Sequence, residues 1–96
     1  MSKRFFDMPT RELTIPNEEG LHARPAAKFV KLANQFSCEI WVEKDDEEIN
    51  GKSIMGLMML AAGQGEVIIV SAEGEDADTA LERLSELVNS GFESDC

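Results

Sequence analysis

The 96-residue sequence predicts one small α+β domain, because strand patterns and helix patterns alternate along it. Four short segments are rich in β-branched residues or alternate between apolar and polar positions, which is typical of strands. Three other segments repeat apolar residues at helical spacing. Strands with one polar face need cover on the other face only, so we expect the three helices on one side of the sheet.

The expected elements follow the order β-α-β-β-α-β-α. Strands are expected at residues 11–15, 38–43, 47–50 and 67–71, and the last of these is apolar enough to be central. Helices are expected at residues 23–34, at 54–60 and from about 77 to 90. Pro25 suits a first helical turn and Ser53 an N-cap. The pair Gly63 and Gly65 is expected to close the second helix, and Gly91 the third.

Composition excludes several classes of protein. A net charge of −10 disfavours a nucleic-acid partner. No apolar run reaches the roughly 18–20 residues of a membrane helix, and the first nine residues do not resemble a secretion signal, so we expect no membrane insertion and a cytoplasmic location. The two cysteines, Cys38 and Cys96, form no metal-ligand motif, and we expect neither a metal nor a cofactor.

The acidic residues leave two windows of the sequence free of negative charge. No Asp or Glu lies between Gly20 and Cys38, or between Ile49 and Gly65. These windows contain basic residues, and they would form a locally positive patch if they met in space. Chance clustering is the alternative explanation. The residues concerned are His22, Arg24, Lys28, Lys31 and Lys52.

His22 is the one histidine of the chain and stands directly before the first predicted helix. An imidazole is a nucleophile near pH 7. A phosphoryl group on this side chain would face free backbone N–H groups and the positive end of the helix dipole. Arg24 could donate charge-assisted hydrogen bonds to it, and Pro25 would hold the first turn in place. The alternative is an ordinary surface or core histidine, and position alone does not decide between the two.

Two motifs carry a resemblance to a known family. The segment GLHARPA at residues 20–26 resembles the active-site signature of HPr, the phosphocarrier of the bacterial sugar phosphotransferase system. The segment GKSIMGLM at residues 51–58 resembles the second HPr signature, at the matching separation. The resemblance covers residues 10–92 and implies an open-faced β-sandwich, with an antiparallel sheet of order 1-4-2-3 and three helices on one face. Residues 1–9 would then be an N-terminal extension and residues 93–96 a C-terminal tail.

The resemblance also implies a function. His22 would accept a phosphoryl group, in the family on Nδ1, from phospho-enzyme I, which is itself charged from phosphoenolpyruvate. The acceptor would be an enzyme IIA domain, and Arg24 would bind the phosphoryl group. Such a protein is a carrier that relies on partner enzymes, and not an enzyme with its own turnover. We expect it to be a monomer.

Ser53 and the helix after it have two interpretations each. Ser53 caps the helix, which typically contributes about 1 kcal/mol, and the resemblance adds phosphorylation by an ATP-dependent HPr kinase/phosphorylase. Ile54, Met55, Met58 and Met59 are either all absorbed by the core and loop or partly exposed as a docking surface, where methionine adapts to several partners. The resemblance favours exposure of Ile54, Met55 and Met58. Three lysines, Lys28, Lys31 and Lys52, would form a basic rim that steers association, or would simply be solvated.

The sequence departs from the sugar-pathway pattern in its extension, its acidity and its loop before His22. That loop contains Glu18 and Glu19, whose charges could repel a phosphate. A regulatory paralogue of the nitrogen-related phosphotransferase system, acting mainly through protein–protein interaction, is therefore the alternative. Two other classes stay open: a small-ligand regulatory domain with a ferredoxin-like fold, which would not need His22, and an interaction protein in which His22 is vestigial.

Overall fold

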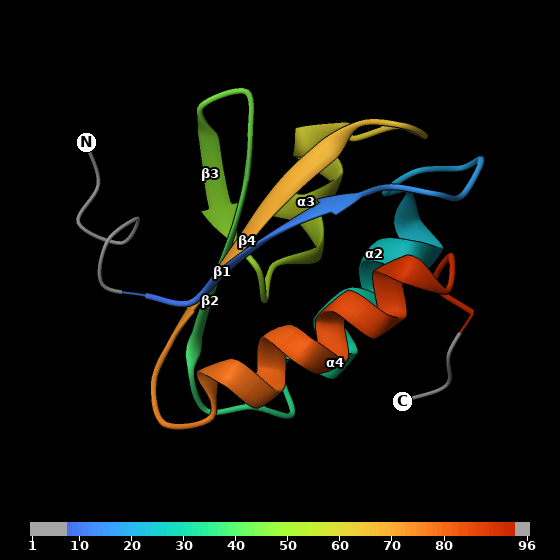
Figure 1. Ribbon diagram of the computed structural model, residues 1–96. Coiled ribbons are helices and arrows are strands. Elements are labelled where there is room, and N and C mark those ends of the chain that lie inside the picture. The colour runs from blue at the N-terminus through green and yellow to red at the C-terminus, as the bar shows by residue number, and fades with distance from the viewer. Residues whose placement is uncertain (1–7, 94–96) are drawn as a thin grey trace.

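The computed structural model describes residues 8–93 and contains seven helices and strands within that range (Figure 1). The residues 1–7 and 94–96, which include most of the expected extension and tail, lie outside the described part. The element order β-α-β-β-α-β-α is confirmed. The elements are β1 (Thr10–Thr14), α2 (Ala23–Ala33), β2 (Glu39–Lys44), β3 (Glu47–Asn50), α3 (Ile54–Leu60), β4 (Val67–Glu73) and α4 (Ala77–Asn89).

The four strands form one antiparallel sheet in the order β1-β4-β2-β3, as predicted. The most apolar strand, β4, is central, and β1 and β3 form the two edges. The helices α2 and α4 pack side by side in opposite directions, so the start of α2 lies near the end of α4 (Figure 1). The shorter helix α3 packs on α2 and on β3.

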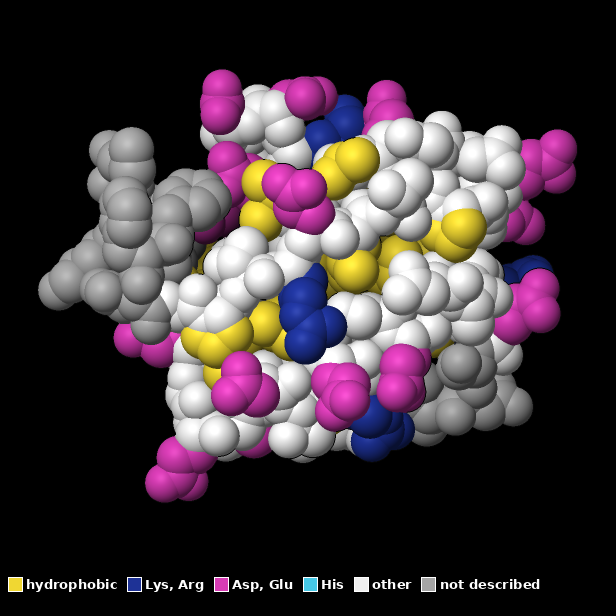
Figure 2. Space-filling view, in the orientation of Figure 1, with side chains coloured by type: hydrophobic (Ala, Val, Ile, Leu, Met, Phe, Trp, Pro, Cys, Tyr) yellow, Lys and Arg dark blue, Asp and Glu magenta, His cyan; other side chains and the backbone are white. Residues whose placement is uncertain are grey.

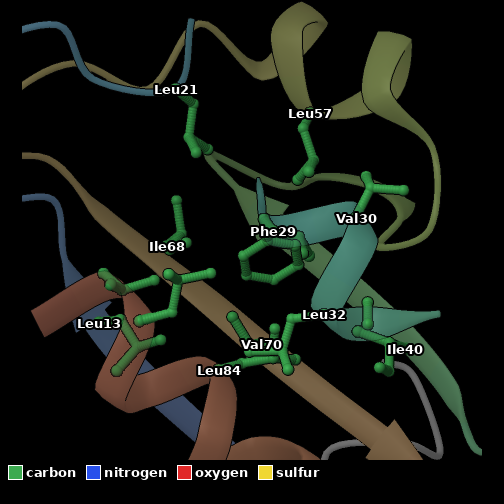
Figure 3. Packing of buried hydrophobic residues seen from close by; sticks show 14 of the residues in the cluster. Leu13, Leu21, Phe29, Val30, Leu32, Ile40, Leu57, Ile68, Val70 and Leu84 are labelled. Atoms are coloured by element: carbon green, nitrogen blue, oxygen red, sulfur yellow. The ribbon is translucent and has the colours of Figure 1, made fainter. Parts of the chain in front are cut away.

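The core lies between the sheet and the helices. Strand alternation sends Ile40 and Val42 of β2, with Ile68 and Val70 of β4, to the covered face. Phe29 of α2 is fully buried and lies among the apolar side chains of the sheet and α3 (Figure 3). Complete burial of one such side chain contributes roughly 1.5–3 kcal/mol. The apolar face of α2 is thereby committed to the core, and Ala23 and Arg24 at its start remain at the surface.

The ends of several elements differ from the predicted ones. The helix α3 ends at Leu60, and Ala61 takes the left-handed conformation (φ 52°) that we had assigned to the following glycines. Gly65 instead has φ 87° in the turn before β4, where its N–H donates to the Ile15 carbonyl at 2.8 Å. This hydrogen bond closes the β1–β4 pair, so long-range pairing decided where the glycine conformation was needed. Gly91 does follow the last helix, with φ 73°.

Asp76 joins two segments that are distant in the sequence. It occupies the N-cap position of α4, but its side chain does not cap that helix. Its carboxylate accepts hydrogen bonds from the backbone N–H groups of Ser37 (2.9 Å) and Cys38 (3.0 Å), and so joins the start of α4 to the segment before β2. The Ser37 N–H is the main reason that the pKa of Asp76 is lowered. Burial, aided by Asp76, raises the pKa of the Cys38 thiol to about 11.

Candidate functional site

His22 occupies the N-cap position of α2 and is exposed. Its backbone is extended (φ −79°, ψ −171°), and its side chain makes no capping hydrogen bond. Its carbonyl accepts from the Ala26 N–H at 2.9 Å, which closes the first turn. The imidazole therefore projects from the helix start and makes no hydrogen bond with the rest of residues 8–93.

The first turn of α2 can bind an anion. Its Ala23 and Arg24 N–H groups precede the first intrahelical hydrogen bond, and Pro25 has no N–H to satisfy. No acidic residue lies in this turn, so nothing there competes for the positive end of the helix dipole. Arg24 is exposed, and its guanidinium forms no ion pair with any residue of the described chain. These groups meet the requirement predicted for a transient phosphoryl group.

The start of α2 borders an open hollow of about 1250 Å³, which we call the His22 hollow. Its wall combines the loop before α2, the first turns of α2, the connection after α3 and the end of α4. Acidic side chains are spread over the face in Figure 2, where no His side chain is visible. The lining residues are 16–19, 21–25, 28, 58, 61–63 and 89–93.

The loop that leads to His22 is tightly held. The Leu21 N–H donates to the Ala62 carbonyl at 2.9 Å, and the Asn17 side-chain amide donates to the Gly20 carbonyl at 3.0 Å. Gly20 has φ 67°, and a Cβ on it would meet the Ala62 oxygen at 2.4 Å. Only glycine allows this close approach of the two backbones. The loop therefore presents His22 in a defined place.

The basic residues are only partly gathered around His22. Arg24 and Lys28 line the hollow, whereas Lys31 and Lys52 do not. Lys28 donates to the Phe92 carbonyl after α4, and Lys52 donates to the Phe36 carbonyl after α2, each at 2.8 Å. Both ammonium groups thus donate hydrogen bonds to carbonyl oxygens near helix C-termini, where positive charge is favourable. Lys31 is exposed at the last turn of α2.

The two windows without acidic residues do meet in space. The first includes α2 and the second includes α3, and these helices pack together. The Leu21–Ala62 and Lys52–Phe36 hydrogen bonds also join them. A surface without Asp or Glu from these windows therefore extends from the start of α2 across α3.

Ser53 and α3 agree with the sequence expectations in their geometry. Ser53 is the N-cap of α3, and its Oγ accepts from the Gly56 N–H at 3.0 Å. Only two residues of the helix, Leu57 and Leu60, are buried. The apolar remainder is exposed, and Met58 also lines the His22 hollow. The exposed fractions are 41% for Ile54, 74% for Met55, 44% for Met58 and 66% for Met59.

Comparison with known proteins shows which family has a similar sequence. Residues 9–90 match the family described as "PTS HPr component phosphorylation site". The phosphocarrier protein HPr of Pseudomonas aeruginosa is 49% identical over 87 residues, which are 90% of this chain and 97% of that protein.

This chain belongs to the HPr family of phosphocarrier proteins.

Solved structures of the family have the same fold. The crystal structure of HPr-C-His from Thermoanaerobacter tengcongensis has a TM-score of 0.87 and 48% identity, and the match covers 93% of this chain and 100% of that one. The crystal structure of Crh from Bacillus subtilis, described as a catabolite repression protein and a domain-swapped dimer, has a TM-score of 0.71 and 42% identity. That match covers 88% of this chain and 97% of Crh. The ferredoxin-like alternative is therefore wrong.

Three features of this HPr-family site were not anticipated from the sequence. Met59 is 66% exposed, although the docking surface predicted from the resemblance contained only Ile54, Met55 and Met58. Asn17 holds the loop before His22, and the backbone carbonyl of Phe92 holds Lys28. The exposure of Met59 could have been inferred from helical periodicity, because it lies four residues from Met55. The contacts of Asn17 and Phe92 depend on tertiary structure.

Replacing Gly20 should test how firmly the loop is held. Gly20→Ala should lower the free energy of unfolding by about 2–5 kcal/mol, because left-handed strain adds to a clash with the Ala62 carbonyl. Gly65→Ala is the matched control: it has φ 87° but no atom within 4 Å of the added Cβ, so strain alone should cost about 1–2 kcal/mol. Urea unfolding measures both. Equal losses would show that the Gly20–Ala62 contact is not restrictive.

In the described chain, no helix has both the length and the apolar character needed to cross a membrane. Within residues 8–93, no group of three or more His, Cys, Asp or Glu side chains is arranged to hold a metal ion.

Proposed function

We propose that His22 accepts a phosphoryl group from phospho-enzyme I and passes it to an enzyme IIA domain of a phosphotransferase system. The observation that supports this most is the exposed imidazole at the start of α2, beside two free backbone N–H groups and Arg24. Membership of the HPr family supports the same role. The partner enzymes supply the rest of each transfer site, so the protein acts as a carrier.

The transfer conserves the phosphoryl group. The lone pair of an imidazole nitrogen, Nδ1 by the family resemblance, attacks phosphorus and forms a P–N bond. The bond from phosphorus to the donor breaks, and its electron pair leaves with the donor. The Ala23 and Arg24 N–H groups and the Arg24 guanidinium stabilise the phosphoryl oxygens. Passing the group to enzyme IIA reverses these steps at His22.

Partner docking would use α3 and the edge of the His22 hollow. Exposed apolar side chains of α3 adjoin the hollow through Met58, and contiguous exposed apolar surface marks interaction sites. The side chains are Ile54, Met55, Met58 and Met59. Lys28, Lys31 and Lys52 would supply a positive rim. Since Lys28 and Lys52 also hold backbone carbonyls, Lys31 is the residue whose substitution tests steering without disturbing such a contact.

Phosphorylation by enzyme I and phosphoenolpyruvate should depend on His22 and Arg24. Wild-type protein should gain one acid-labile phosphate, and His22→Ala none. Arg24→Ala should slow phosphorylation by about 10- to 100-fold, because it loses hydrogen bonds to a charged group. Rapid-quench kinetics with radiolabelled phosphoenolpyruvate provide the measurement.

The matched control for Arg24→Ala is Arg83→Ala, which removes an exposed arginine from α4, outside the hollow. It should leave the rate unchanged. Thermal unfolding of each variant excludes loss of the fold. Phosphate bound to folded His22→Ala, or none on the wild type, would contradict the proposal. Comparing enzyme IIA domains of sugar and nitrogen-related systems as acceptors would decide between the two branches.

We also propose that Ser53 is a regulatory phosphorylation site. A phosphoserine adds a charge of about −1.5 to −2. Here the charge would lie beside exposed Ile54, within the segment between Ile49 and Gly65 that contains no Asp or Glu. This would disfavour docking of an acidic partner. The N-cap position tolerates the added charge, because a helix N-terminus favours an anion.

HPr kinase/phosphorylase with ATP should therefore label the wild type and Ser37→Ala, but not Ser53→Ala. Ser37 is an exposed serine before β2 and serves as the control. Ser53→Ala also loses the cap to the Gly56 N–H, which should cost about 1 kcal/mol, so its fold must be checked by thermal unfolding. Intact-protein mass spectrometry measures the labelling. An unlabelled wild type, or a labelled Ser53→Ala, would remove Ser53 from the regulatory role.

The proposed carrier is a monomer. In the described chain, β1 pairs with β4 of the same chain and buries Leu13 in the same core. A domain-swapped dimer, as described for Crh, would preserve such contacts between two chains, so mass is the property that distinguishes them. Light scattering should give the monomer mass of 10.6 kDa across micromolar concentrations. A stable species of twice that mass would contradict the monomer.

A further inference from the structure

Glu19 places a carboxylate in the same hollow as His22 and Arg24. Glu19 belongs to the loop before α2, His22 is the N-cap of α2, and Arg24 lies in its first turn. Glu19 is exposed, and so are His22 and Arg24. Any phosphoryl group on His22 would therefore share the hollow with a negative charge supplied by the protein itself.

The position of Glu19 is fixed by its neighbours. The Asn17 side-chain amide donates to Glu19 Oε1 at 3.4 Å and to the Gly20 carbonyl at 3.0 Å. The Gly20 N–H donates back to the Asn17 carbonyl at 3.1 Å. Because Gly20 is itself pressed against Ala62, the loop has little freedom to carry Glu19 away from the hollow.

The charge of Glu19 is also well defined. The hydrogen bond from Asn17 is the main cause that lowers the pKa of Glu19, and the nearby Arg24 and His22 lower it further. Glu19 is therefore ionised at neutral pH and lies within electrostatic range of both groups. Glu18 makes no hydrogen bond to another described side chain.

The other charged groups of the hollow do not offset Glu19. Lys28 donates to the Phe92 carbonyl, which holds its ammonium group at the end of α4. Glu18 and Glu93 also line the hollow and add two further exposed carboxylates. Within the described residues of the hollow, Arg24 is thus the cation not already bound to a protein oxygen, and Glu19 and a phosphoryl group would both be attracted to it.

We propose that Glu19 sets the phosphoryl-transfer potential of His22, by repelling the phosphoryl group and competing with it for Arg24. This inference rests on the proposed phosphorylation of His22. A carboxylate beside the phosphorylated imidazole destabilises the loaded state relative to the free one. Loading from the donor becomes less favourable and passage to the acceptor becomes more favourable by the same factor, because both equilibria contain the same free-energy difference between the loaded and the free carrier.

The equilibrium of phosphoenolpyruvate plus protein with pyruvate plus phosphoprotein, catalysed by enzyme I, tests this directly. Glu19→Gln should raise the equilibrium constant for loading by about two- to five-fold at low ionic strength, the scale of interactions between exposed charges. High salt should reduce the difference between the variant and the wild type. The glutamine oxygen can still accept from Asn17, so the loop should keep its structure, and unchanged thermal unfolding would verify this.

Glu18→Gln is the matched control, because it removes the same charge from an adjacent residue that also lines the hollow but is not held by Asn17. Its effect should be less than half that of Glu19→Gln. Equal effects of the two variants, or a change in rate with no change in equilibrium, would overturn the inference while leaving phosphorylation of His22 intact. A wild type that gains no phosphate on His22 would overturn the proposed function, and this inference with it.

Discussion

The site depends on one backbone contact, the hydrogen bond from the Leu21 N–H to the Ala62 carbonyl. It joins the loop before α2 to the connection after α3, and the left-handed Gly20 lets the two backbones approach closely enough to form it. The contact turns Leu21 into the core and leaves the next residue, His22, at the surface. Binding groups supplied by α2 and the Met58 side chain of α3 consequently border a single hollow.

Within this frame the charges serve different purposes. The protein carries a net charge of −10, yet the first turn of α2 is free of acidic residues. Lys28 and Lys52, which a surface view would count as steering charges, bind carbonyls that follow helix ends and so stabilise the fold as well. Arg24 has no such partner in the described chain. A cation without a protein partner beside an exposed nucleophile is suited to an anion that arrives and leaves.

The helix α3 has only seven residues, and they are divided between the core and the surface. Two leucines hold it to the core, and its first turn is capped by Ser53. The remaining apolar side chains have no core to enter, because α2 and β3 already occupy the inner side of so short a helix. Their exposure follows from geometry, and it provides an adaptable apolar surface next to the His22 hollow.

The sequence by itself determined the element order, the exposed face of α3 and the place of His22 at a helix start, because periodicity, caps and helix-start residues act over a few neighbouring positions. It could not place Gly65 or Asp76, whose conformations and partners come from pairing between β1 and β4 and between α4 and the segment before β2. Nor could it show that Glu19, and not Glu18, is held by Asn17 in the hollow. Such contacts join residues that are brought together only when the sheet and helices pack, and tertiary structure alone decided them.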